Sequence, residues 1–139
     1  MLPCVACGKC WSNNKPCIFN DDSNQLEEVL FKTDIIVLVG PVYWYTFNAQ
    51  MKLMLDKLYP YIEKKLPRPL PIKQSYLLAC CFDDSLDTFS GMVQTYLDIT
   101  KYMKWEDAGQ LLVTKVGLEN DIDNNVALEQ AYTMANNIE

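Results

Sequence analysis

The chain contains no histidine, and this absence removes a large part of ordinary protein catalysis. Without an imidazole there is no Ser-His or Cys-His nucleophile pair and no mixed Cys/His zinc site. Any redox or metal chemistry must therefore come from thiolates, carboxylates or a bound cofactor.

Basic residues and long apolar segments are also scarce. The 12 Lys and Arg residues are outnumbered by 18 Asp and Glu residues, which gives a net charge of -6. This charge repels phosphate backbones and anionic lipids, so we expect no nucleic-acid and no membrane partner. The longest apolar segment, from Ile35 to Trp44, is about half the ~20 residues that a membrane span needs. The N-terminus lacks the pattern of a signal peptide, and a cytoplasmic location is the default expectation.

The length of the chain and the order of its patterns predict one α/β domain. With 139 residues, of which 50% are hydrophobic, the chain falls within the roughly 100 to 200 residues of a single domain. We assign residues 1–139 to it, with a cysteine-rich loop at 1–22 and alternating helix and strand over 23–139. The strand patterns fall at 35–39, 76–82 and 111–118, and the helical patterns at 23–31, 51–62, 89–103 and 124–138. Such alternation is typical of a parallel sheet flanked by helices.

Four of the six cysteines, Cys4, Cys7, Cys10 and Cys17, lie close together near the start of the chain. Their C-x2-C-x2-C-x6-C spacing resembles iron-sulfur ligation, because three nearby thiolates can wrap one face of a cluster while a fourth closes it. Zinc is a weaker interpretation, since structural zinc usually draws on two C-x2-C pairs separated by a longer loop. The third interpretation is a loop of reduced, metal-free thiols.

An aromatic turn follows the first strand pattern and contains Tyr43, Trp44 and Phe47. It stands at the carboxyl end of a parallel strand, where open α/β sheets bind ligands. Tyr43 and Trp44 can stack on a planar ring, and Pro41 stiffens the turn. The alternative is that these aromatic side chains fill the core or a subunit interface.

Two acidic pairs precede predicted helices. Asp83 and Asp84 follow the second strand pattern, where Asp83 is the expected opposite wall of the ring site and Asp84 suits helix capping. Asp21 and Asp22 precede the first helical pattern, and we expect Asp22 to cap it. For Asp21 and Asp22, capping is favoured over a metal or general acid-base role.

The ordered series of these motifs resembles a known family. The residues that carry the likeness are the four cysteines, the segment 34–43, the segment 49–52 with Asp56, and the segment 104–109. Together they resemble the NAD(P)H-dependent FMN reductases, which are flavodoxin-like proteins. The cysteine spacing is similar to that of the iron-sulfur flavoprotein subgroup, in which a compact motif holds a [4Fe-4S] cluster next to FMN.

The resemblance implies a function and a set of site residues. It implies a flavodoxin-like parallel sheet, FMN as cofactor, a [4Fe-4S] cluster on the four cysteines, and NAD(P)H as electron donor. Hydride passes from the nicotinamide to the flavin, so no catalytic side chain is required. The residues implied to bind the cofactor are Pro41, Val42, Tyr43, Trp44, Phe47 and Asp83.

This sequence also departs from the family pattern. Family members open with a strand, a Gly-Ser-x-Arg phosphate loop, a helix and a second strand, whereas this sequence starts at the cysteines. The resemblance therefore implies an N-terminally truncated domain of about three strands, without the main anchor for the FMN phosphate. We expect a second copy or a partner chain to cover the sheet edge next to the strand from Ile35 to Val39.

Three hypotheses follow for the function. The first is an FMN-dependent NAD(P)H oxidoreductase, or a truncated member of that family. The second is an iron-sulfur electron-transfer module with a Cys4 cluster. The third is a non-catalytic remnant or interaction domain that pairs through its open sheet edge.

Overall fold

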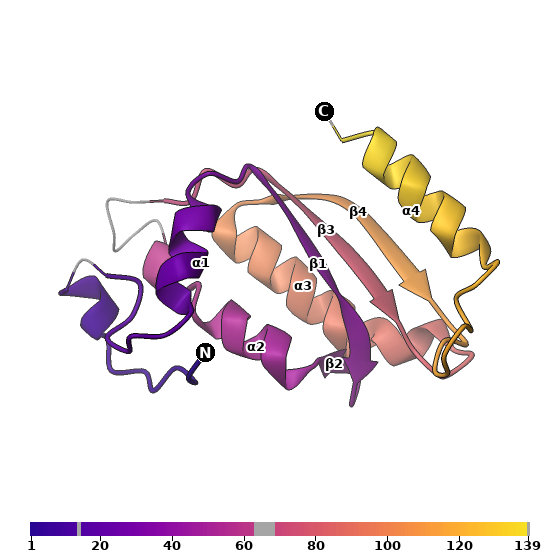
Figure 1. Ribbon diagram of the computed structural model, residues 1–139, viewed down its shortest axis with the longest axis horizontal. Coiled ribbons are helices and arrows are strands. Elements are labelled where there is room, and N and C mark those ends of the chain that lie inside the picture. The colour runs from indigo at the N-terminus through magenta and orange to yellow at the C-terminus, as the bar shows by residue number, and fades with distance from the viewer. Residues whose placement is uncertain (14, 63–68, 139) are drawn as a thin grey trace.

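The computed structural model describes residues 1–13, 15–62 and 69–138. The predicted domain also includes residues 14, 63–68 and 139, which lie outside the described residues. The chain folds into a sheet with helices on both sides, and the cysteine-rich loop lies at the opposite end of the molecule from the C-terminal helix (Figure 1). Within the described ranges, no helix is long and apolar enough to cross a membrane.

The sheet has the order β2-β1-β3-β4. Its strands are β1 (Ile35–Tyr43), β2 (Thr46–Phe47), β3 (Gln74–Cys80) and β4 (Glu106–Val113). β3 lies in the middle and pairs in parallel with β1 on one side and β4 on the other. β2 is antiparallel and pairs with β1 only at Val42 and Tyr43. The sheet is therefore mostly parallel, as the alternation of patterns predicts.

Helices connect the strands and cover the sheet. The α-helices are α1 (Ser23–Leu30), α2 (Ala49–Asp56), α3 (Ser90–Met103) and α4 (Val126–Asn136), and the 3-10 helices are η1 (Lys9–Trp11), η2 (Tyr59–Tyr61) and η3 (Leu86–Phe89). α2 begins where the Asn48 side chain accepts a hydrogen bond from the backbone N–H of Met51 at 2.9 Å, a typical helix cap. α2 ends shortly before Pro60, and α3 ends at Met103, directly before Lys104, whose φ is 60°. These elements confirm the predicted α/β class.

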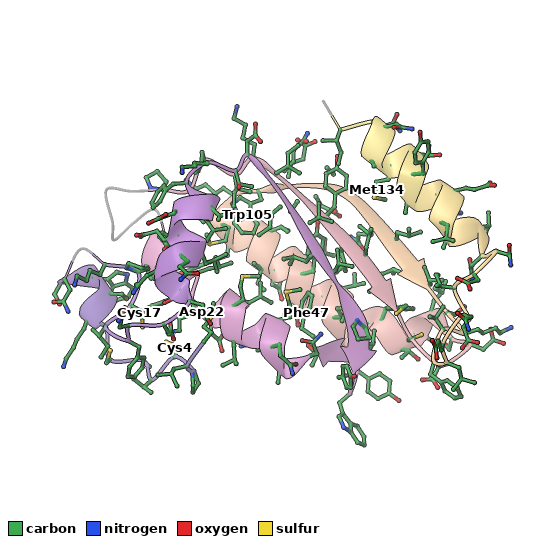
Figure 2. The ribbon with its side chains drawn as sticks, viewed as in Figure 1. Cys4, Cys17, Asp22, Phe47, Trp105 and Met134 are labelled. Carbon is green, nitrogen blue, oxygen red and sulfur yellow. The ribbon has the colours of Figure 1, made fainter. Side chains whose placement is uncertain are left out.

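The core lies between α3 and the sheet. Phe89 and Tyr96, at the start and in the middle of the η3–α3 segment, are 0% exposed. The Tyr96 hydroxyl lies 3.0 Å from Ser75 Oγ on β3 and donates to Asp107 Oδ1 on β4 at 2.9 Å. On the other face, α4 packs against β4, and a Cβ added at Gly109 would lie 3.2 Å from Met134 Cε. Met134 is labelled on α4 in Figure 2.

The third predicted strand was misplaced. The apolar pattern predicts a strand at 111–118, whereas β4 spans Glu106–Val113. β4 is an edge strand with one strand neighbour, so its first residues need not be apolar and include Glu106, Asp107 and Gln110. An apolar pattern therefore marks only the second half of β4.

The capping predictions also need correction. Asp22 occupies the N-cap position of α1 but makes no capping hydrogen bond with its side chain. Asp21 supplies the oxygen instead, because its Oδ1 accepts from the Ser23 backbone N–H at 2.9 Å. At η3, Ser85 Oγ rather than Asp84 accepts from the backbone N–H of Asp87.

β1 has an open edge and an open face. Beyond its short pairing with β2, no strand among the described residues pairs with its outer edge over residues 35–41. Val37 and Val39 pair in register with Tyr76 and Leu78 and so share the sheet face that α4 covers. α4 packs on β4, on the far side of β3 from β1, and Val37 and Val39 are 42% and 58% exposed. The most apolar strand thus lies near an edge, although its composition favours a central position.

Candidate functional site

The cysteine-rich loop is tightly curled. Ala6 and Gly8 both have positive φ, 53° and 68°, so the backbone reverses twice between Cys4 and Cys10. Gly8 adopts this conformation without a steric cost, whereas Ala6 is strained by it. Gly8 then starts η1, whose Trp11 backbone N–H donates to the Gly8 carbonyl at 3.2 Å. Ala6 lies between Cys4 and Cys7, and backbone strain of this kind is common at functional sites.

The four predicted cluster ligands, Cys4, Cys7, Cys10 and Cys17, line one small cavity of about 30 Å³. Cys4 and Cys17 come from opposite ends of the loop and both lie in the same part of the molecule in Figure 2. Burial raises the pKa of the Cys10 thiol, and the charges of the other three cysteines raise it further. Within the described residues, no three Cys, Asp or Glu side chains converge closely enough to hold a metal ion as they stand. Four thiols are by their chemistry the donor set of an iron-sulfur cluster, but their present positions are not those of bound ligands, so binding a cluster would require the thiols to turn toward a common point.

A buried lysine completes this cavity. Lys57, which follows α2 directly, has a side chain that is only 4% exposed. Its Nζ donates to Cys17 Sγ at 3.0 Å, lies 3.4 Å from Asp21 Oδ2, and sits 5.3 Å from the centre of the Phe19 ring. Burial alone would lower the pKa of Lys57, but the hydrogen bond to Cys17 and the charges of Cys17 and Asp21 outweigh it and raise that pKa. A fixed positive charge therefore faces the sulfur of one predicted ligand.

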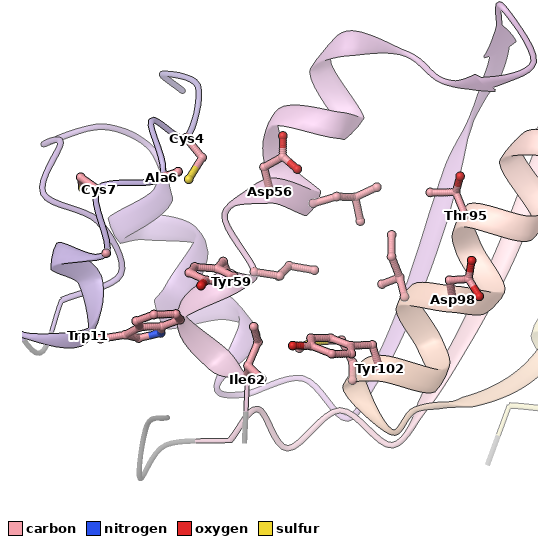
Figure 3. Close-up of a pocket in the computed structure, with 15 residues that line it drawn as sticks. Cys4, Ala6, Cys7, Trp11, Asp56, Tyr59, Ile62, Thr95, Asp98 and Tyr102 are labelled. Carbon is pink, nitrogen blue, oxygen red and sulfur yellow. The ribbon is translucent and has the colours of Figure 1, made fainter. Parts of the chain in front are cut away.

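A larger groove of about 800 Å³ adjoins the cysteine cavity. It lies between the cysteine-rich loop and α3, with Asp56 and Tyr59 between them (Figure 3). Tyr59 stacks on Trp11 with ring centroids 4.3 Å apart, and Tyr102 projects from α3 on the other side. Cys4 and Cys7 line both the groove and the cavity, so the groove gives direct access to the predicted cluster site.

The structure places the predicted flavin residues at the carboxyl ends of the parallel strands. Pro41, Val42 and Tyr43 end β1, and Trp44 follows in the turn to β2, with a φ of 48°. Trp44 is 91% exposed, so its ring is free to stack on a planar ligand. Phe47, by contrast, is buried in the core at 6% exposure.

The second predicted wall of the flavin site lies at the same edge of the sheet. Asp83 follows β3, and its Oδ2 accepts a hydrogen bond from Thr88 Oγ1 at 3.0 Å. The Phe82 ring packs closely on Gly117, where an added Cβ would lie 2.2 Å from Phe82 Cδ2. Asp83 and the aromatic turn therefore lie at the carboxyl ends of two neighbouring parallel strands, each on its own loop.

This edge suits a ring but not a phosphate. The loops after β3 and β4 are acidic. The first contains Asp83 and Asp84, and the acidic residues of the second include Glu119 and Asp121. The lysine of these loops, Lys115, is paired with Asp84, whose Oδ1 lies 2.9 Å from its Nζ. Carboxylates repel a phosphate group, so these two loops do not fit the phosphate end of FMN.

Sequence reasoning missed Lys57. A local pattern does indicate that this lysine is buried, because positions 53, 54 and 57 share one side of a helix and the other two are the apolar residues Leu53 and Met54. A lysine on such a face is partly or fully buried and needs an anionic partner. The partners, Cys17 and Asp21, lie 36 or more positions away, and no local pattern connects them to it.

Comparison with known proteins supports the resemblance seen in the sequence. No family profile matches the chain. A segment of 58 residues is 34% identical to an iron-sulfur flavoprotein of Archaeoglobus fulgidus, and 57 residues are 34% identical to one of Methanosarcina thermophila. A third iron-sulfur flavoprotein, from Methanocaldococcus jannaschii, is 33% identical over 58 residues. The matches cover 41–42% of this chain and 26–30% of these relatives, so the chain spans less than a third of their length in each match.

A solved structure shows the same fold. The Trp repressor binding protein from Bacillus subtilis matches with a TM-score of 0.69 over 84% of this chain and 71% of that chain, at 21% sequence identity. The fold is therefore flavodoxin-like, as predicted. The chain is a distant and partial homologue of the iron-sulfur flavoproteins.

Proposed function

We propose that this chain is an electron-transfer module of a flavodoxin-like oxidoreductase, in which Cys4, Cys7, Cys10 and Cys17 hold a [4Fe-4S] cluster. The observation that carries the proposal is that all four cysteines line a single cavity. The homologous segments of three proteins named iron-sulfur flavoproteins support it. Four thiolates are the donor set of such a cluster.

The residues around the cavity have distinct roles in this proposal. When bound, the cluster would accept and donate single electrons. Asp21 holds the loop in place, because its carboxylate accepts a hydrogen bond from the backbone N–H of Leu2 at 2.7 Å and pairs with Lys57. Tyr59, stacked on Trp11, forms part of the groove through which an electron donor or acceptor reaches the cavity.

In this proposal the whole oxidoreductase, rather than this chain alone, uses FMN as cofactor and NAD(P)H as electron donor. The exposed aromatic turn at Tyr43 and Trp44 supports a flavin ring at the sheet edge. The acidic loops after β3 and β4 do not fit its phosphate, so we derive no step through FMN on this chain. Saturable quenching of flavin fluorescence on adding the chain to FMN would support flavin binding, and its absence would remove FMN from the proposal for this chain.

Anaerobic reconstitution with iron and sulfide tests the cluster directly. We expect a brown protein with about four irons per chain. Cys10→Ser should lose the colour and the iron. Cys80→Ser is the matched control, because Cys80 lies on β3, outside the motif, and this variant should keep four irons. A wild-type protein that stays colourless and iron-free would refute the proposal.

A second function, association through the β1 edge, is favoured by the outer edge over residues 35–41, with which no strand in the described part of the chain pairs. Such an edge pairs with an extended segment, and we propose that a strand of a second polypeptide binds it. Val39→Lys should weaken association in sedimentation experiments without unfolding the chain. Val29→Lys on α1 is the control, since Val29 is 59% and Val39 58% exposed. A chain that is monomeric, alone and with any candidate partner, contradicts this function.

A further inference from the structure

The cluster proposal leaves one feature of the cavity unexplained, the ammonium group of Lys57. Its side chain is 4% exposed, and a buried charge is costly unless it is well paired. Among the described residues, the groups close to it are a carboxylate at 3.4 Å, a sulfur at 3.0 Å and an aromatic ring. The shortest of these contacts is to the sulfur of Cys17, not to the carboxylate of Asp21.

The chemistry of this contact is specific. An ammonium group only donates hydrogen bonds, so the Cys17 sulfur is the acceptor. Sulfur accepts best when it is anionic, as in a thiolate or in a thiolate that ligates iron. Hydrogen bonds to the sulfurs and the net charge around a cluster set its reduction potential. Four thiolates give a cluster a net negative charge, and one added electron makes that charge larger.

We infer that Lys57 is a positioning residue that raises the reduction potential of the cluster through its charged hydrogen bond to Cys17. This inference rests on the proposed cluster. The reduced state carries one more negative charge than the oxidised state, so a nearby ammonium group stabilises it more. Exclusion of water strengthens the effect, since Lys57 and Asp21 are both buried. Lys57 follows α2 directly, so the ordered helix fixes the position of its backbone.

The first test compares reduction potentials in anaerobic titrations with dithionite, a one-electron donor, followed by EPR of the reduced cluster. Lys57→Met keeps the length of the side chain and removes the charge. We expect the equilibrium constant for reduction to fall about tenfold, which equals about 59 mV for one electron. Lys52→Met is the matched control, because Lys52 lies on α2, which Lys57 directly follows, and has a side chain that is 52% exposed. This control should have the wild-type potential.

The outcomes separate the inference from the proposed function. A Lys57→Met protein with four irons and the wild-type potential overturns the inference and leaves the cluster intact. A wild-type protein without iron overturns the proposed function and the inference with it. Lys57→Arg keeps a charged donor and should stay within about threefold of wild type. An Arg variant shifted as far as the Met variant assigns the effect to packing and overturns the inference.

A second measurement needs no variant and so holds even if Lys57→Met fails to fold or to bind iron. Wild-type protein labelled with 15N at lysine is reconstituted and reduced, and ENDOR spectra are recorded. A hydrogen bond from Lys57 Nζ to Cys17 Sγ predicts a 15N coupling and an exchangeable proton that disappears in D2O. A reduced cluster that shows no lysine nitrogen coupling overturns the inference.

Discussion

Replacing Asp21 by asparagine (Asp21→Asn) is expected to destabilise the fold far more than the same change at Asp22. The Asp21 side chain is 9% exposed, and its Oδ2 lies 3.4 Å from Lys57 Nζ. It also accepts hydrogen bonds from the backbone N–H of Leu2 and from the N–H and hydroxyl of Ser23. Asparagine leaves the ammonium without its compensating charge. Removing one partner of a buried ion pair costs about 3 kcal/mol or more, which lowers Tm by about 10 °C in a chain of this size.

The dependence of stability on pH provides a second signature of Asp21. Burial alone would raise the pKa of Asp21, but hydrogen bonds from Ser23 and Leu2 and the charge of Lys57 outweigh it and hold that pKa well below 3.8. A carboxyl whose pKa is lower in the folded state contributes stability above its unfolded pKa and loses it as the pH falls through the folded pKa. The wild-type protein should therefore lose this contribution below about pH 4, and Asp21→Asn should not.

Urea unfolding at pH 7, with thermal melts from pH 7 down to pH 2, measures both effects. Asp22→Asn is the control, since it removes the same charge from a side chain that is 74% exposed and pairs with the N-terminus at 3.0 Å. An exposed pair of this kind contributes about 1 kcal/mol or less. The reasoning is refuted if the two variants unfold within about 1 kcal/mol of each other at pH 7. It is also refuted if Asp21→Asn keeps the wild-type loss of stability below pH 4.

Three further predictions concern the fold around the sheet. Gly91→Ala should cost about 2 kcal/mol in urea unfolding, because the new Cβ would lie 2.5 Å from the Tyr45 carbonyl oxygen; unchanged stability would contradict this contact. Tyr96→Phe should cost about 1 to 2 kcal/mol through the lost hydrogen bond to Ser75. Burial raises the pKa of Tyr96 above 10.0, so the wild type should lose stability above pH 10 and the Phe variant should lose less. Trp44→Ser should change stability by less than about 0.5 kcal/mol, since Trp44 is 91% exposed, and a larger loss would place its ring in a packed environment.

The elements that the sequence predicted well are those with a strong local pattern. The segment from Ile35 to Val39 lies in β1, so the strand itself was predicted correctly. Its continuous apolar run predicts burial on both faces, whereas Leu38 is buried and Val37 and Val39 are 42% and 58% exposed. The periodic apolar residues at Phe89, Met92 and Tyr96 predicted the buried side of the η3–α3 segment, and all three are buried. In that segment, local composition and tertiary environment agree.

The elements that were misplaced depend on neighbours that local patterns do not reveal. β4 lies at a sheet edge, so it can begin with the charged residues Glu106 and Asp107. Its first residues carry no apolar pattern that would predict the pairing with β3. Asp21 rather than Asp22 caps α1 because Lys57, far along the chain, draws the Asp21 carboxylate inward. Asp21 and Asp22 are adjacent residues of the same type, so the sequence does not show which of them accepts the capping hydrogen bond. The charge of Lys57 distinguishes them in the folded chain.

The candidate site shows the same division. The spacing of the four cysteines was sufficient to predict that they share one cavity, because they lie on one short loop. The charge that faces them was not predictable, since Lys57 reaches Cys17 across 40 positions of sequence. The sequence therefore predicted that the four cysteines lie together, but not the lysine that faces one of them.

The position of Lys57 argues for a role beyond stability. Replacing a buried ion pair by apolar residues of similar volume is often neutral or stabilising, so the fold alone does not require an ammonium group beside Asp21. In a chain with a net charge of -6, an anionic cluster adds further negative charge to the loop. In the proposed holo protein, Lys57 would offset that charge at the sulfur of Cys17, which lies 3.0 Å from its Nζ, and it would act most strongly on the reduced state. The proposed cluster therefore supplies a reason for a charged group at this position that the fold alone does not supply.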